Sequence, residues 1–135
     1  MSECNESCTY TREDLLSLAN ELSQHHWGIP YTGDIIIHNR NWKRQNASFR
    51  RGIEDKCKLW FEFSEVRNAQ RTNDQVKGTL LHELVHWYLY IHNEPFHDND
   101  ERFVQEAVRV GAPISETKIA QKAYENYLKE VAGDE

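Results

Sequence analysis

The sequence predicts a small α+β domain in which a short run of strands is set apart from the helices. Three observations predict this class. The length of 135 residues is typical of one domain. Apolar residues recur at helical spacing in four segments, and strand patterns occur only between the first and second of these. No strand pattern returns after the longest helical segment, which argues against alternating α/β units.

The first helix is expected over residues 11–28, because leucines recur there every three or four positions. Thr9 or Thr11 can cap its start and Gly28 can close its end. Residues 1–10 are polar and are expected to form a flexible tail. A single domain is then expected over residues 11–135.

Two or three strands are expected next, at Ile35–Asn39 and Lys58–Ser64, with Ala47–Arg51 as the candidate for a further one between them. The last of these alternates apolar residues with Trp60 and Glu62, as a strand with one inward and one outward face does. Residues 52–57 are expected to form the hairpin loop between the second and third strands.

A central helix is expected to begin near Thr72, which makes a possible capping box with Gln75, and to end before Pro95. Its apolar residues cover more than one narrow stripe, which is typical of a buried helix. A short helix at Asp100–Val110, capped by Asn99 or Asp100, and a last helix opened by Ser115 are expected to follow.

The net charge of −6 argues against a protein that coats nucleic acid with its whole surface. Between Arg40 and Lys58, however, seven basic residues stand against two acidic ones, and Trp42 and Phe49 lie among them. Such a segment is either the solvated face of two strands or a surface for phosphate contact and base stacking. The candidate DNA contacts are Arg40, Lys43, Arg44, Arg50 and Arg51.

Nothing in the sequence indicates export or a membrane span. No apolar run approaches the roughly 18 residues that a span requires, and the polar N-terminus has no apolar signal region. A cytoplasmic location is therefore expected. The odd set of three cysteines, Cys4, Cys8 and Cys57, is expected to consist of free thiols.

The sequence HELVH within the central helix predicts a zinc site. His82 and His86 are four residues apart, so both imidazoles can face one ion from the same side of the helix. Glu83 lies beside them and can take a proton from a metal-activated water. A chance match to this pattern in a chain of this length has a likelihood of about 1% or less.

Catalytic zinc usually has three protein ligands and an open fourth position. His97 and Glu106 are both candidates for the third ligand. His97 follows a turn after the helix, and Glu106 lies on the next helix. His92 is on the far side of the central helix from His86 and is expected to be a surface residue.

The stretch LLHELVHWYLYIHNEPFHDNDERFVQEAVRVGAP resembles the SprT-like family of zinc metalloproteases, which includes the bacterial SprT proteins and the eukaryotic Spartan protease. The matching residues are the HELVH motif, His97 followed by Asp98, Phe103, and the ending RVGAP. The resemblance covers roughly residues 12–114. It implies a zincin-like fold, one zinc ion, and His97 as the third ligand. Unlike many members, this chain has no CxxC pairs of a C-terminal zinc ribbon.

The resemblance implies a zinc metallopeptidase that hydrolyses peptide bonds with Glu83 as general base, and DNA-associated proteins are one implied substrate class. Zincins commonly align the substrate along a strand edge, for which Lys58–Ser64 or Ile35–Asn39 are candidates. The alternative function is a non-hydrolytic module, in which zinc only stabilises the fold and the basic segment binds nucleic acid or a protein. A zinc site closed by four protein ligands, including His97 and Glu106, is a third possibility.

Overall fold

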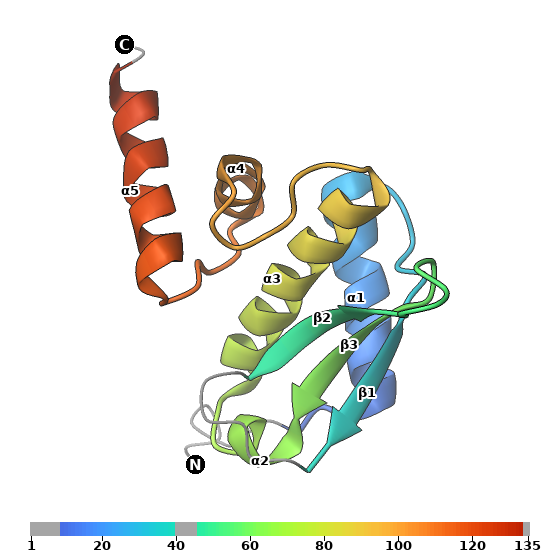
Figure 1. Cartoon of the computed structure of the whole chain (residues 1–135). Helices are drawn as coiled ribbons and strands as arrows, with labels where there is room; N and C mark the ends of the chain where they lie inside the picture. Colours follow the sequence, from blue (N-terminus) through green and yellow to red (C-terminus); the bar gives the residue numbers. More distant parts are fainter. Residues whose placement is uncertain (1–8, 40–45, 134–135) are drawn as a thin grey trace. The chain divides into compact units, whose positions relative to one another are not determined.

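The computed structural model describes residues 9–39 and 46–133, and within these ranges the α+β class is confirmed. The described residues form five helices and a three-stranded sheet (Figure 1). In chain order the elements are α1 (Arg12–Trp27), β1 (Asp34–His38), β2 (Ala47–Arg51), β3 (Leu59–Ser64), α2 (Glu65–Asn68), α3 (Asn73–Ile91), α4 (Glu101–Val110) and α5 (Lys118–Gly133). They belong to two compact units, and the boundary between Glu83 and Leu84 falls inside α3.

In the first unit, α1 has both of the ends predicted from the sequence. Thr11 and Asp14 form a capping box, in which the Asp14 N–H donates to Thr11 Oγ1 at 3.1 Å and the Thr11 N–H donates to Asp14 Oδ2 at 2.9 Å. Gly28 ends the helix in the left-handed conformation at φ 70°. The caps satisfy main-chain groups that the helix itself leaves unpaired.

The sheet has the strand order β1-β3-β2. β3 runs antiparallel to β2, with Phe49 opposite Phe61, and parallel to β1, with Ile35 opposite Phe61. Because β3 is hydrogen-bonded on both sides, Lys58–Ser64 is excluded as the free edge for substrate, whereas the other candidate, Ile35–Asn39, falls on the outer strand β1. The outer strands of the sheet are β1 and β2.

The predicted inward and outward faces of β3 are confirmed. Phe61 and Phe63 are buried, whereas Trp60 and Glu62 are partly exposed on the other face, where the Trp60 indole donates to Glu62 Oε2 at 2.9 Å. The loop from β2 to β3 is the predicted hairpin, closed by a bond of 2.8 Å from the Gly52 N–H to the Lys58 carbonyl. The buried phenylalanines thus form part of the core of this unit.

Arg12 joins α1 to the start of β1. Its Nε donates to the Ile35 carbonyl at 2.8 Å, and its Nη2 pairs with the Asp34 carboxylate. The Ile35 N–H bonds to the same carboxylate at 2.8 Å. This N–H, followed by the Arg12 guanidinium, lowers the pKa of Asp34 below its ordinary value of 3.8. The charged form of Asp34 is therefore the one that stabilises the fold.

Replacing Asp34 by Asn is expected to lower the free energy of unfolding at pH 7 by less than about 1 kcal/mol, because the pair is largely exposed and screened. A carboxyl whose pKa is lowered by folding stabilises the protein above its unfolded pKa and loses this effect as the pH falls through the folded pKa. The difference between parent and variant in thermal unfolding should therefore shrink below about pH 4. The exposed Glu54→Gln serves as control, and a difference that persists unchanged at pH 3 would refute this account.

The helix α3 begins with the predicted capping box: the Thr72 N–H donates to Gln75 Oε1 at 3.0 Å, and the Gln75 N–H donates to Thr72 Oγ1 at 3.2 Å. Its end is a Schellman turn. Asn93 adopts φ 59°, its N–H donates to the Tyr90 carbonyl, and the Glu94 N–H donates to the Leu89 carbonyl. Pro95 follows, so the chain leaves the helix in a fixed direction.

The two last helices belong to the second unit. Asp100 is at the N-cap position of α4, but its carboxylate makes no capping bond to the helix; it accepts the His97 N–H at 2.9 Å instead. Gly111 ends α4 at φ 81°. α5 begins later than predicted, with Thr117 Oγ1 accepting the Ala120 N–H at 3.2 Å. Its apolar face is largely exposed at Ile119, Leu128 and Val131. Among the described helices, none has the length and apolar character needed to cross a membrane.

Candidate metal centre

The HELVH motif lies on α3, as the sequence predicts. His82 and His86 are separated by about one turn of this continuous helix and share one face. Both are half-buried. Glu83 is buried, with only 6% of its surface exposed. Burial of a charged carboxylate costs free energy unless polar or cationic groups interact with it.

The ring of His86 is held in one orientation. Its Nδ1 hydrogen-bonds to the Phe96 carbonyl, and the ring stacks on Phe103 with centroids 4.3 Å apart. A carbonyl oxygen can only accept, so Nδ1 carries the proton. Nε2 is then the nitrogen available to a metal, which is the arrangement that second-shell partners impose on metal-binding histidines.

Asp98 lies next to this nitrogen, with Oδ1 at 2.8 Å from His86 Nε2. His82, His86 and Asp98 each offer one ligand atom, and these atoms lie within 4.8 Å of one another. Two imidazole nitrogens and one carboxylate oxygen form a donor set that suits Zn²⁺. The residues present therefore fit a zinc ion, and three protein ligands would leave a fourth position for water.

His97, the third ligand implied by the family resemblance, is not in this group. Its side chain is 68% exposed, and its Nδ1 lies 3.5 Å from the Asp100 carboxylate. The structure brings the neighbouring residue, Asp98, to His86 instead. The sequence signal that could have identified Asp98 is its type and position, since it directly follows His97 and a carboxylate is an ordinary zinc ligand.

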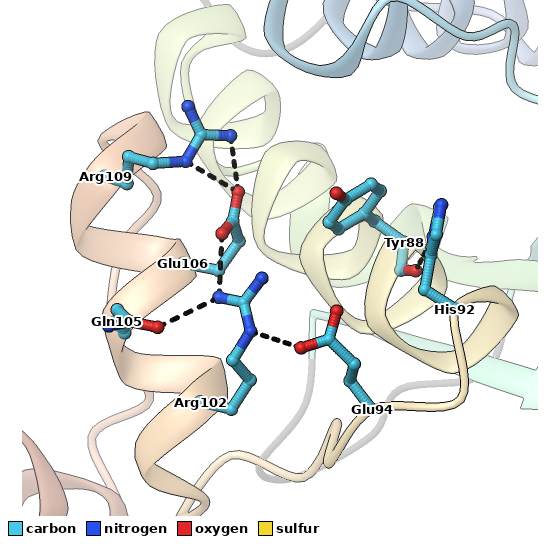
Figure 2. Close-up of polar contacts among 7 residues, drawn as sticks. All are labelled: Tyr88, His92, Glu94, Arg102, Gln105, Glu106 and Arg109. Atoms are coloured by element: carbon cyan, nitrogen blue, oxygen red, sulfur yellow. Dashed lines mark hydrogen bonds and ion pairs between the residues drawn. The ribbon is translucent and has the colours of Figure 1, made fainter.

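Glu106, the other candidate from the sequence, is engaged by two arginines (Figure 2). Its Oε1 accepts Arg102 Nη1 at 2.8 Å, and its Oε2 accepts Arg109 Nε at 2.8 Å. Only 5% of its side chain is exposed. Both of its oxygens thus serve ion pairs within α4. His92 is exposed, as predicted, and its Nδ1 lies 2.8 Å from the Tyr88 carbonyl.

The turn after α3 borders an open hollow of about 410 Å³. Its lining residues are Tyr90, Asn93, Glu94, Pro95, Phe96 and His97. The rings of Tyr90 and Phe96 meet edge to face, 5.2 Å apart. Phe96 also supplies the carbonyl that orients His86, and the lining residue His97 directly precedes the candidate ligand Asp98 in the sequence.

The structure describes only part of the predicted DNA-binding segment. Arg40, Lys43 and Arg44 lie outside the described residues. Arg50 and Arg51 are exposed on β2, and Arg50 Nε is 3.9 Å from the Glu62 carboxylate. A neighbouring acid reduces the attraction of this edge for phosphate.

Of the three cysteines, Cys57 is an exposed free thiol, as predicted. Cys4 and Cys8 lie outside the described residues, as does most of the predicted N-terminal tail. Thr9 is described, and its N–H donates to Asn73 Oδ1 at 3.0 Å.

Comparisons of this chain with protein-family models, with curated proteins and with solved structures gave no match.

Proposed function

We propose that this protein is a zinc-dependent metallopeptidase, with His82, His86 and Asp98 as its metal ligands and Glu83 as its general base. The observation that carries the proposal is the setting of His86. Its Nδ1 is tied to a main-chain carbonyl, and its Nε2 faces a carboxylate in a group that includes His82. Two histidines one turn apart, together with a carboxylate, supply the three protein ligands that are usual for catalytic zinc.

Zinc bound by these residues would lower the pKa of a water molecule toward about 7 and polarise the scissile carbonyl. The chain's own residues supply the rest of the chemistry. Glu83 takes the proton of the attacking water and returns it to the leaving amine. Its burial favours this role, because interactions of a carboxylate with nearby charges are stronger away from bulk water.

The HELVH motif and the resemblance to SprT-like proteases support a zincin-like arrangement and a protein or peptide as substrate. The hollow lined by Tyr90 and Phe96 offers apolar surface for a substrate side chain close to the candidate ligands along the chain. DNA-associated proteins are a substrate class that the family resemblance implies, and Arg51 on β2 is an exposed basic residue that could contact DNA phosphate.

Metal removal tests the proposal. Protein loaded with zinc is expected to contain one ion per chain and to cleave unfolded casein, because an unfolded chain presents accessible peptide bonds. Treatment with a chelator should lower the cleavage rate at least about tenfold, because removal of zinc removes the activation of the attacking water and the polarisation of the scissile carbonyl. Added zinc should restore the rate. The measurement is zinc content together with the rate of release of acid-soluble peptides. Equal cleavage by the metal-free protein would refute the proposal.

A further inference from the structure

The segment between α3 and α4 supplies both groups that face His86. Phe96 contributes the carbonyl that accepts from Nδ1, and Asp98 contributes the carboxylate beside Nε2. The segment is irregular and largely exposed. Irregular exposed segments are mobile unless side chains tie them down. The geometry at His86 therefore depends on what fixes this segment.

One side chain of α4 reaches the segment at Glu94 (Figure 2). Arg102 donates from Nε to Glu94 Oε1 at 2.6 Å and from Nη1 to Glu106 Oε1 at 2.8 Å. Glu94 is the residue directly after the left-handed Asn93 and two residues before Phe96. The guanidinium thus connects the start of the ligand-bearing segment to a helix.

The end of this connection at Glu106 is rigid. Glu106 is nearly fully buried, and its second oxygen accepts from Arg109 at 2.8 Å. A planar guanidinium that makes bonds along two of its edges has little freedom to rotate. Because Glu106 holds Arg102 and Arg102 holds Glu94, the place of Glu94 is set relative to α4. Phe103, on which the His86 ring stacks, belongs to the same helix.

We infer that Arg102 is a positioning residue for the candidate metal centre: by fixing Glu94 it places the Phe96 carbonyl and the Asp98 carboxylate against His86. The inference rests on the proposed function, because it assigns to the ion pairs an effect on metal binding. A purely structural role would stabilise the metal-free protein without changing its affinity for zinc.

Arg102→Met tests this role. It removes the bond to Glu94, while Glu106 keeps its partner Arg109. The Kd for zinc is expected to rise about tenfold, the lower end of the effect of losing a second-shell partner. Arg109→Met is the matched control, since it removes the other arginine of Glu106 but no contact with Glu94. Its Kd should change less than about twofold. Competition with a chromophoric chelator measures Kd at a temperature where circular dichroism shows every metal-free variant folded.

Glu94→Gln is the second variant and is used if Arg102→Met does not fold. It keeps the side-chain size and the Arg102–Glu106 pair but loses the charge at Glu94. Exposed Glu101→Gln on α4 controls for that change of charge. A higher Kd for Glu94→Gln alone supports the inference. Unchanged Kd values with a lower unfolding temperature overturn it and leave the proposed function standing. If the parent protein binds no zinc, the proposed function fails first and the inference with it.

Discussion

Replacement of Glu83 by Gln is expected to lower the rate of peptide hydrolysis by at least about 100-fold while zinc remains bound. An amide of nearly the same size cannot take a proton from water, and loss of a general base typically costs a factor of 10² to 10⁴, or about 3 to 5 kcal/mol in activation free energy. Glu83 is not in the group of candidate ligands, so the zinc content should stay at that of the parent. The measurements are kcat/KM on unfolded casein and zinc per chain.

The control for this prediction is Glu101→Gln, which makes the same chemical change at an exposed position of α4 and should leave the rate unchanged. Parent-like cleavage by the Glu83 variant would exclude the proposed role of this carboxylate. If neither protein cleaves any substrate, with or without single-stranded DNA, while both hold one zinc ion, the alternative of a non-hydrolytic zinc-stabilised module is favoured.

The second large effect is expected at Asp98. Asp98→Ala should raise the Kd for zinc by more than about 100-fold, because the loss of a ligand exceeds the 10- to 100-fold cost of losing a second-shell partner. His97→Ala, one residue away, should change the Kd less than about twofold, since its side chain is mostly exposed and paired with Asp100. The Kd values from chelator competition, measured on the folded metal-free proteins, provide the comparison.

These two variants test whether the third ligand is Asp98, which lies beside His86 in the structure, or His97, which the family resemblance implies. A large effect of His97→Ala and a small effect of Asp98→Ala would show that the ligand implied by the resemblance is the correct one. In that case Asp98 would not be a ligand. Equal large effects of both would point to a fourth protein ligand and to a closed, structural zinc site.

Much of the secondary structure follows from local sequence. The caps of α1 and the capping box of α3 depend on residues within a few positions of each other, so Thr11, Gly28 and Thr72 could be identified directly. The order of the strands in the sheet could not be identified from local sequence. The parallel pairing of β1 with β3 depends on contacts between segments more than twenty residues apart, which no local period encodes. For the same reason, the sequence left the choice between Lys58–Ser64 and Ile35–Asn39 as a free edge open, and the strand order excludes Lys58–Ser64.

In the candidate metal centre, too, only the residues fixed by local sequence could be predicted. The helix period alone places His82 and His86 on one face, and the motif identifies Glu83. The third ligand depends on how an irregular segment folds, and neither His97 nor Asp98 has a periodic pattern to distinguish it. The role of Glu106 is set by Arg102 and Arg109 on the same helix. Spacings of three and four residues predict such pairs, but they do not exclude metal binding.

The group that orients His86 is a main-chain carbonyl, so no substitution of the side chain at position 96 deletes it. What this bond requires is a particular number of residues between the left-handed turn at Asn93 and Phe96. The length of this short stretch is thus constrained, in addition to the bond that Glu94 within it makes to Arg102. An insertion or deletion of one residue there would turn the imidazole away even if every histidine and carboxylate were kept.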